Sequence, residues 1–502
     1  MDFFIGTIFL TGLFVLFVAC FLFYSNNDNC DPSIPYANYG SYPIIGHLIA
    51  FSRDRTKLLL ECSKRYGSCF RIKVLNQSFI IIPAHNDWTT IVRSQSFKFS
   101  PEEFGMRLFG LSSSLVSKYN CKRQPNNYKY TYFILAQSEF DEDTHRLYVL
   151  HLKNRDGLHS IVAEFLNRIR QLMTNDKEEI EKNGDVSKWI SCGLLELSHH
   201  MLYQPSTLAL IGEINPASLE NDFSTFDKNF HYFFIPFPQW IYSWFFSPVL
   251  QARTRLNESW LKNPEPLKAS DFHRDRIALL SSYSQWISKQ DYGAFLTGFM
   301  WASLGNTIPG VFWSLFYILR DKQALETIKQ EMDTHILDDN WIQPEQLDAC
   351  VYLESAINET LRLVGAPFMT RKCIRQAEVH LQDGRTITVK PNETLAWFGA
   401  VSHYDDRMFP NADKFIFDRF LNRKADTVPG YMPFGAGKSI CPGRFFAKYE
   451  IKTCVAVLLR YMEYKLENVE TVPPQIQSRI GVGIAPPSKD IPILYRYKSS
   501  MS

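Results

Sequence analysis

The chain has 502 residues, of which 45% are hydrophobic, 15% aromatic and 21% charged, so it is neither disordered nor fibrous and can bury a large core. Its formal net charge is only +2, and no block of lysine and arginine alternates with aromatic residues, so we do not expect nucleic acid as a partner. Ten cysteines are scattered without a C-x-x-C pair, which indicates reduced thiols and argues against a disulfide-rich secreted scaffold.

The N-terminal segment is the first element in chain order. Residues 3–24 form an uncharged run of 22 residues, which as a helix would cross a hydrocarbon layer of ~30 Å. We therefore predict an N-terminal membrane anchor over residues 1–29, with its transmembrane helix at about 3–24. A cleaved secretory signal is the alternative, but the run has no basic region before it and no clear small-x-small cleavage site.

A proline-rich connector is predicted over residues 30–43. Its three prolines fix φ and prevent a helix from continuing out of the membrane. The first basic residue, Arg53, lies beyond it, and the basic residues that follow favour a cytosolic body. The folded body is predicted over residues 44–502.

Hydrophobic periodicity alternates between strand and helix within the body. Residues 69–84 contain two β-branched and aromatic runs around a polar turn, and residues 378–398 contain a second predicted hairpin with Asp-Gly at its turn. Between about 145 and 365 the apolar spacing is largely helical. Since no repeat or low-complexity linker divides the body, we predict one mainly α domain of the α+β class, with small sheets near both ends.

One cysteine lies in a glycine-rich loop, FGAGKSICPGRFFA, over residues 434–447. The pattern F-x-x-G-x-x-x-C-x-G would occur in roughly 0.002 of shuffled chains of this composition. Gly435 and Gly437 allow a tight turn against a flat ligand, and the apolar residues after Gly443 recur at helical spacing. Backbone N–H groups at the helix start favour a thiolate, so Cys441 is a candidate axial metal ligand. A buried structural cysteine explains this loop alone equally well.

A possible charge cluster involves two distant segments. Glu359 and Arg362 are three residues apart in ESAINETLRL, so both project from one face of a predicted helix. Such a pair is usually exposed and contributes little to stability. Arg419 in FIFDRFL would complete a Glu-Arg-Arg cluster if the chain folds back on itself.

Taken together, ETLR at 359–362, FDRF at 417–420 and the cysteine loop, in this order and at these separations, resemble the cytochrome P450 superfamily. The resemblance extends over essentially the whole chain and is strongest from about Trp301 onward. It implies that Cys441 is the proximal thiolate ligand of a b-type haem, which would supply the oxygen chemistry.

The same resemblance assigns supporting roles around the haem. Phe434 would shield the sulfur, Gly437 would leave room for the macrocycle, and Gly443 would belong to the same cofactor-binding loop. The Glu-Arg-Arg cluster would lock the core beneath the haem without touching substrate.

The predicted helix from about 292 to 320 would cross the distal face of the haem. Pro309 cannot donate a hydrogen bond to the carbonyl of Gly305, so that carbonyl is expected to be free and the helix distorted there. We predict a polar opening suited to dioxygen or peroxide, which Asn306 and then Thr307 would face. A proline kink that serves packing alone is the alternative.

Two features depart from the usual family pattern. The acid and threonine that commonly handle protons on this helix align with Ile308 and Pro309. The arginine that commonly holds a haem propionate, two residues before the cysteine, is replaced by Ser439 with Lys438 beside it. Arg371 in APFMTR is the candidate propionate ligand instead, and a solvated arginine at a strand end is the other interpretation of it.

These departures resemble one branch of the family, which contains the sterol 7α-hydroxylases, the sterol 12α-hydroxylase and prostacyclin synthase. WAS followed by G-N-x-x-P, then APFMTR and SRIGVGIAPPSKDIPILYRY, carry this resemblance. It implies a monooxygenase that hydroxylates a sterol or related lipid with O₂ and with electrons that an NADPH-cytochrome P450 reductase delivers. The alternatives are a prostacyclin-synthase-like isomerase of a lipid endoperoxide or hydroperoxide, which needs no reductase, and a non-catalytic haem-binding membrane protein.

A lipid bilayer is the other expected partner. Residues 230–250 are crowded with aromatic side chains and contain three prolines. Aromatic side chains with polar tips favour membrane interfaces, and in the family this region commonly dips into lipid. Ordinary core packing is an equally good explanation. Together with the anchor, the segment predicts a single-pass protein of the endoplasmic reticulum membrane.

Overall fold

The computed structural model describes residues 31–43, 45–75, 77–94, 99–100, 108–111, 128–183, 188–234, 239–285, 287–336, 341–437, 440–466 and 471–498. The chain divides into two compact units, each described by itself. The first consists of Met1–Glu102, Phe368–Asp405 and Ala436–Ser439, and the second of Glu103–Pro367, Asp406–Gly435 and Ile440–Ser502. The predicted anchor lies outside the described residues, as do Lys438 and Ser439.

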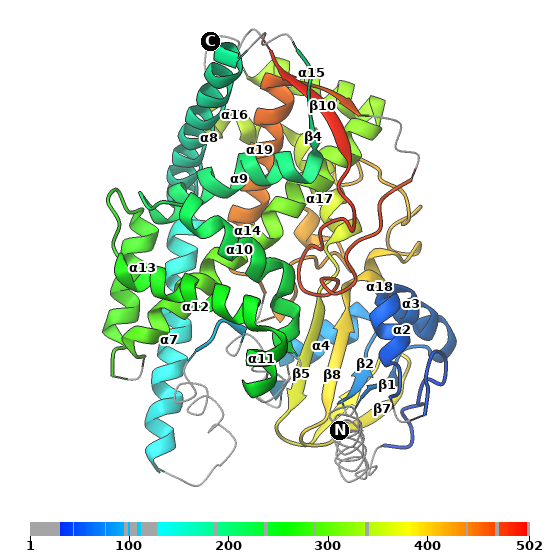
Figure 1. Cartoon of the computed structure of the whole chain (residues 1–502). Helices are drawn as coiled ribbons and strands as arrows, with labels where there is room; N and C mark the ends of the chain where they lie inside the picture. Colours follow the sequence, from blue (N-terminus) through cyan, green and yellow to red (C-terminus); the bar gives the residue numbers. More distant parts are fainter. Residues whose placement is uncertain are drawn as a thin grey trace, which may run out of the picture. The chain divides into compact units, whose positions relative to one another are not determined.

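The first unit is built on a mixed five-stranded sheet and a separate two-stranded sheet (Figure 1). In spatial order the larger sheet contains β1 (Phe70–Val74), β2 (Gln77–Ile81), β8 (Thr394–Phe398), β5 (Phe368–Cys373) and β3 (Phe99–Ser100). The smaller sheet pairs β6 (Ala377–His380) with β7 (Thr386–Val389). Its helices are α2 (Leu48–Arg53), α3 (Arg55–Tyr66), α4 (His85–Ser94) and α18 (Gly399–His403).

Both predicted hairpins are confirmed in this unit. β1 and β2 pair antiparallel with Phe70 opposite Ile81, and β6 and β7 pair around the Asp-Gly turn. The last five residues of the segment 378–398 lie outside the second hairpin. They form β8, which pairs in parallel with β2 and antiparallel with β5. All five residues of β8 are buried, as expected for a central strand that is covered on both faces.

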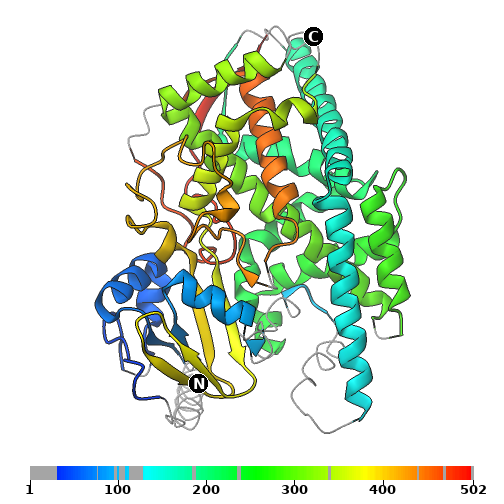
Figure 2. The same cartoon turned by 180° about the vertical axis from the view of Figure 1, so that it is seen from behind.

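The second unit is mainly helical (Figures 1 and 2), which confirms the helical prediction for about 145–365. Its helices are α7 (Tyr128–Leu152), α8 (Arg155–Asn183), α9 (Leu194–Ile211), α10 (Ala217–Asn229), η2 (Phe230–Phe234), α11 (Gln239–Phe245), α12 (Ser247–Lys262), α13 (Asp271–Ser282), α14 (Lys289–Arg320), α15 (Lys322–His335), α16 (Pro344–Asp348), α17 (Val351–Val364), η3 (Ala425–Thr427) and α19 (Arg444–Tyr461). A small antiparallel sheet places β10 (Pro492–Tyr497) between β4 (Ile190–Gly193) and β9 (Met462–Leu466).

α14 is the core helix of this unit. It packs against α9, α12, α17 and α19. Its first turn is a capping box in which Ser288 and Asp291 satisfy each other's backbone N–H groups, so the helix begins slightly before the predicted residue 292. Among the described residues, α14 is the one helix long and apolar enough to cross a membrane, but 72% of its apolar window is buried inside the protein. It is therefore part of the core.

Candidate functional site

Cys441 lies in the loop that leads into α19. Its backbone N–H donates a hydrogen bond to the carbonyl oxygen of Phe434 at 2.9 Å, which closes the loop. Gly435 and Gly437 have φ angles of +83° and +68°, a left-handed conformation that residues with a Cβ atom adopt only with strain. Among the seven described cysteines, only Cys441 and Cys192 are not fully buried. The glycines therefore shape a loop in which Cys441 is partly exposed.

The surroundings of the Cys441 sulfur favour the thiolate less than predicted, because burial opposes the donors at the helix start. Burial raises the pKa of the thiol, while the backbone N–H of Gly443 and the positive charge of Arg444 act in the opposite direction. Arg444 Nη1 also donates to the Cys441 carbonyl oxygen at 3.0 Å, which holds the guanidinium beside the loop. The helix start thus supplies the expected donor, but burial is the larger effect. A metal cation bound to the sulfur would displace the proton outright.

Two glycines of the loop have different surroundings. A Cβ atom on Gly437 would lie 2.8 Å from Val92 Cγ2, so packing against α4 excludes a side chain here. This requirement differs from the expected one, which was room for a macrocycle. A Cβ atom on Gly443 would meet no atom of the described residues within 4 Å, so open space borders the loop at this position. The sulfur of Cys441, the backbone N–H of Gly443 and this space suit a thiolate ligand beside a flat metal cofactor.

Arg371 lies in β5 of the first unit. It is only 7% exposed, so a solvated arginine at a strand end does not describe it. Nη1 donates to the carbonyl oxygen of Thr370 at 2.7 Å, and the guanidinium carbon lies 5.7 Å from the centre of the Trp88 ring. Burial lowers the pKa of Arg371, with no contribution from an acidic side chain in the described part of the chain. A buried cation of this kind suits an anionic group such as a carboxylate.

Glu359 of α17 is fully buried and accepts hydrogen bonds from two arginines. Arg362 Nε and Nη2 donate to its two carboxylate oxygens at 2.8 Å each, and Arg419 Nε lies 2.9 Å from Oε2. The backbone N–H of Ile416 adds a further donor at 3.1 Å. The structure thus brings the three predicted residues together as a buried cluster, and the exposed-pair interpretation does not apply.

The same arginines also bind the backbone. Arg362 Nη1 donates to the carbonyl oxygen of Ala412, and Arg419 Nη1 donates to that of Pro410, both at 2.8 Å. These carbonyls belong to an irregular segment, where no helix or strand provides partners. The cluster therefore satisfies backbone groups that regular structure would otherwise satisfy.

Protein groups donate hydrogen bonds to the turn of α14 where a polar opening was predicted. Arg479 Nη2 donates to the carbonyl oxygen of Gly305 at 2.6 Å, so the carbonyl that Pro309 leaves without a helical donor is not free. Asn306 Oδ1 accepts a hydrogen bond from the backbone N–H of Ile484 at 3.0 Å. The expectation of a free carbonyl was wrong, because its donor lies 174 residues away and leaves no trace in the local periodicity.

Thr307 lies near a buried carboxyl group that the sequence analysis missed. Its hydroxyl donates to the carbonyl oxygen of Ser303 at 2.5 Å. Ser206 of α9 donates a hydrogen bond to Oε1 of Glu450 in α19. Burial raises the pKa of Glu450 to about 8, and hydrogen bonding with Ser206 and Thr307 acts in the opposite direction. A lone acidic residue in the apolar run of α19 is the signal that could have revealed this group.

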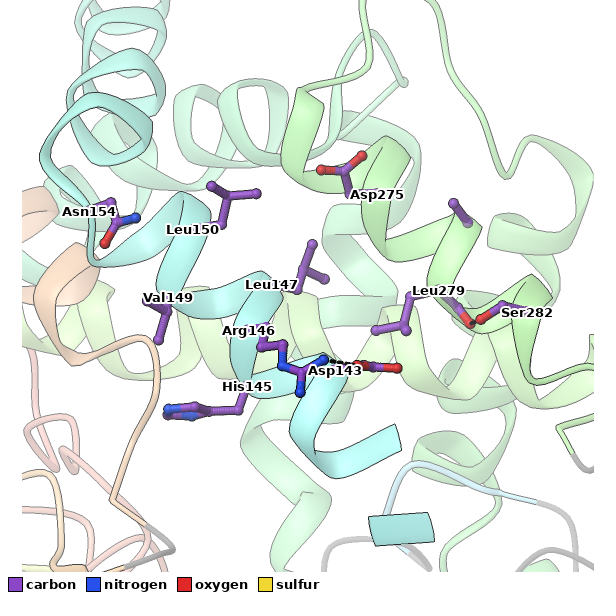
Figure 3. A pocket seen from close by; sticks show the side chains of 11 residues that line it. Asp143, His145, Arg146, Leu147, Val149, Leu150, Asn154, Asp275, Leu279 and Ser282 are labelled. Carbon is purple, nitrogen blue, oxygen red and sulfur yellow. Dashed lines mark hydrogen bonds and ion pairs between the residues drawn. The ribbon is translucent and has the colours of Figure 1, made fainter. Parts of the chain in front are cut away.

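The surface of the described part of the second unit includes two hollows. One of about 850 Å³ lies between α7 and α13, where Figure 3 shows Leu147, Leu150 and Leu279 near an Asp143–Arg146 ion pair. The other, of about 410 Å³, is lined mainly by α17, the segment around η3 and the first turns of α19. None of the predicted site residues lines either hollow.

The sequence is similar to a known family and to several characterised relatives. Residues 37–493 match the family model described as cytochrome P450. The chain is 27% identical to a 7-alpha-hydroxycholest-4-en-3-one 12-alpha-hydroxylase of Oryctolagus cuniculus, over 93% of this chain and 94% of the relative. It is 26% identical to a cholesterol 7-alpha-monooxygenase of Cricetulus griseus, over 92% and 94% respectively.

A solved structure shares the fold. The retinoic-acid-bound cyanobacterial CYP120A1 superposes with a TM-score of 0.69, at 16% identity, over 93% of this chain and 99% of that one. At this identity the similarity supports the fold alone, and it agrees with the predicted helical class with small sheets.

The buried cluster is testable by unfolding. Glu359→Ala is expected to lower the free energy of unfolding by about 3–5 kcal/mol, because two buried arginines lose their carboxylate. Urea denaturation followed by circular dichroism measures the change. The matched control is Glu326→Ala, which removes the exposed Lys322–Glu326 pair of α15 and should change the free energy by less than about 1 kcal/mol. Equal effects of the two substitutions would contradict the role given to the cluster.

Proposed function

Because the chain belongs to the cytochrome P450 family, we propose that it is a haem-thiolate monooxygenase that hydroxylates a sterol or a related lipid. O₂ would be the oxidant, and an NADPH-cytochrome P450 reductase would deliver the electrons. The similarity to a 12-alpha-hydroxylase and a cholesterol 7-alpha-monooxygenase, over 92–93% of the chain, carries this proposal. Since both of these relatives are named for oxygen insertion, the endoperoxide isomerase is the less supported alternative.

The cofactor would be a b-type haem. When bound, it supplies the activation of dioxygen for insertion into a C–H bond. Cys441 would bind its iron through the sulfur, and the open space at Gly443 fits a flat group next to that loop. The buried guanidinium of Arg371 would pair with a propionate. Phe434 would hold the loop closed through its carbonyl oxygen and shield the sulfur with its ring.

Proton handling would not use the usual pair on α14, since Ile308 and Pro309 occupy those positions. Asn306 and Thr307 remain the polar side chains of this turn. Glu450, with a pKa of about 8 that burial raises, keeps its proton at neutral pH and lies within reach of the Thr307 hydroxyl. We include this carboxyl group as the proton-carrying neighbour of Thr307.

The electron donor would dock at the smaller hollow. Lys448 and Lys452 line this hollow: Lys448 pairs with Asp426 at 3.2 Å, and Lys452, which is buried, pairs with Glu354 at 3.1 Å. Lys424 also lines this hollow, which lies on the helix that follows the Cys441 loop. With three lysines and two acids the lining has a small positive charge, which favours association with an acidic protein surface, and such association weakens with salt.

Lipid contact would involve α11 together with the predicted anchor. Trp240, Trp244 and Phe245 are 52%, 78% and 68% exposed, which is unusual for side chains of this size. Tryptophan favours the membrane–water interface. An entrance near this helix would suit a water-insoluble substrate, and location in the endoplasmic reticulum membrane with a cytosolic body is part of the same proposal.

Turnover measurements test the proposed reaction. With reductase, NADPH and isotopically labelled O₂, the vesicle-bound protein is expected to convert a sterol into a product that carries one labelled oxygen atom. Cys441→Ser is expected to abolish both this product and the far-red-shifted carbonyl spectrum that thiolate ligation gives to reduced haem. Turnover of a lipid endoperoxide without reductase and O₂ would support the isomerase. A thiolate spectrum without any turnover would support a non-catalytic haem protein.

The two loop glycines provide a test of cofactor binding. Gly443→Ala is expected to leave the free energy of unfolding of the haem-free protein unchanged but to reduce haem bound per chain, because the new methyl group enters the open space. Gly437→Ala is expected to destabilise the haem-free protein itself by about 1–3 kcal/mol, since it combines a left-handed φ with a clash against Val92. Haem absorbance and urea unfolding separate the two effects. Normal haem occupancy in Gly443→Ala would argue against a cofactor at this position.

Membrane contact by α11 is testable by fluorescence. In the full chain reconstituted into vesicles with brominated acyl chains, Trp240→Phe with Trp244→Phe is expected to lower the fraction of tryptophan emission that bromine quenches. Trp260→Phe is the control, because Trp260 is only 2% exposed. An unchanged quenched fraction in the double variant would indicate that α11 stays in water.

A further inference from the structure

Arg479 is a buried arginine that contacts two helices of the second unit. It is 2% exposed. Nη2 donates to the carbonyl oxygen of Gly305 in α14 at 2.6 Å, and Nη1 donates to Oδ1 of Asp227 in α10 at 2.5 Å. Its guanidinium carbon lies 4.8 Å from the ring centre of Phe230 and 5.5 Å from that of Trp301. A cation, a carboxylate and two aromatic rings therefore converge on one turn of α14.

The neighbouring residues leave room for this arrangement. Trp301 Nε1 donates to the same Oδ1 of Asp227 at 2.8 Å. A Cβ atom on Gly305 would lie 3.1 Å from that oxygen and 3.2 Å from the indole nitrogen, closer than most side chains tolerate. Glycine at this position thus allows the ion pair to approach the helix backbone.

The carbonyl of Gly305 needs a donor from outside the helix because Pro309 has no N–H group. In an α-helix the N–H of each residue donates to the carbonyl four residues earlier, and Pro309, four residues after Gly305, has no N–H. A buried carbonyl without a partner destabilises the fold, because it has lost its hydrogen bonds to water. α14 nevertheless remains helical from Lys289 to Arg320, across the proline. The guanidinium of Arg479 stands where the missing donor would be needed.

We propose that Arg479 is a positioning residue whose guanidinium replaces the backbone donor that Pro309 removes, and that this bond fixes the turn of α14 carrying Asn306 and Thr307. The same C-terminal loop supplies the Ile484 N–H to Asn306 Oδ1, so it holds the turn at two polar atoms. The donor replacement is independent of substrate and cofactor. Its effect on turnover rests on the proposed monooxygenase function.

A double-mutant cycle tests the replacement. Arg479→Met removes the donor but keeps an unbranched apolar side chain, and Pro309→Ala restores a backbone N–H to the helix. If the guanidinium stands in for that N–H, Pro309→Ala should rescue much of the defect of Arg479→Met. If Arg479 only fills space or pairs with Asp227, the two substitutions should act additively.

Arg276 is the matched control. It is also a buried arginine, 8% exposed, and its Nη2 donates to a carbonyl oxygen of α14, that of Phe295, at 3.1 Å. The residue four positions later is Phe299, which has its own N–H, so this carbonyl does not depend on an outside donor. Pro309→Ala should not rescue Arg276→Met.

Amide hydrogen exchange of the purified, haem-loaded protein gives a readout without turnover. Peptides that cover residues 301–313 are expected to exchange about tenfold faster in Arg479→Met, and to return most of the way to the wild-type rate in the double variant. Arg276→Met should leave this segment unchanged. Unaltered exchange in Arg479→Met, or additive changes in the double variant, would overturn the proposal. If Arg479→Met does not fold, Arg479→Leu, which also lacks a donor, takes its place in the cycle.

Coupling of electrons to product gives the catalytic readout. Peroxide released per NADPH consumed is expected to rise about tenfold in Arg479→Met and to fall again in the double variant, because a displaced turn misplaces Asn306 and Thr307. Exchange rates that follow the cycle together with unchanged coupling would overturn the positioning role. A wild-type protein without reductase-dependent turnover would count against the proposed function, and the exchange measurements would still decide the donor replacement.

Discussion

The pairing of the buried Glu359 carboxylate with two arginines is the interaction on which the irregular segment around Pro410 and Ala412 depends. A carboxylate removed from water is costly unless it is paired and hydrogen-bonded, and here two guanidinium groups and a backbone N–H meet that requirement. The remaining donors of Arg362 and Arg419 bind carbonyls of a segment that has no ladder of its own. One fully buried acid thereby orders a stretch of chain that neither helix nor sheet could order.

The same constraint explains the turn of α14 at Pro309. Backbone polar groups in a protein interior need partners, whichever part of the chain supplies them. Near Glu359, the carbonyls that lack a donor from regular structure lie in a loop. At Gly305, the carbonyl lacks its helical donor because of a proline within the helix. Arginine meets both needs, because its planar fork can donate to a carboxylate and to carbonyl oxygens at once.

Local chemistry explains which features could be predicted from the sequence. An Asp-Gly turn, alternating strands and helical periodicity act between near neighbours, so the two hairpins and the long helices were predicted correctly. The pairing of β8 with β2, the contact of Gly437 with Val92 and the bond from Arg479 to Gly305 depend on residues far apart in the chain. No periodicity contains that information. The motif around Cys441 could be recognised, whereas the balance of burial and charge at its sulfur required the fold.

The chemistry of α14 cannot be judged from its own sequence alone, because other elements supply polar groups to it. Its own sequence lacks the acid and the alcohol at the expected positions, so Asn306 and Thr307 are the polar side chains that it offers at the predicted opening. The fold brings polar groups to this turn from elsewhere: Glu450 from α19, near Thr307, and Arg479 and Ile484 from the C-terminal loop. Because α19 begins just after Cys441, the helix that carries the buried carboxyl group also follows the proposed metal ligand. The polar character of the turn is therefore a property of the packed helices and the loop together, and substitutions far from α14 in sequence should alter it as strongly as substitutions within it.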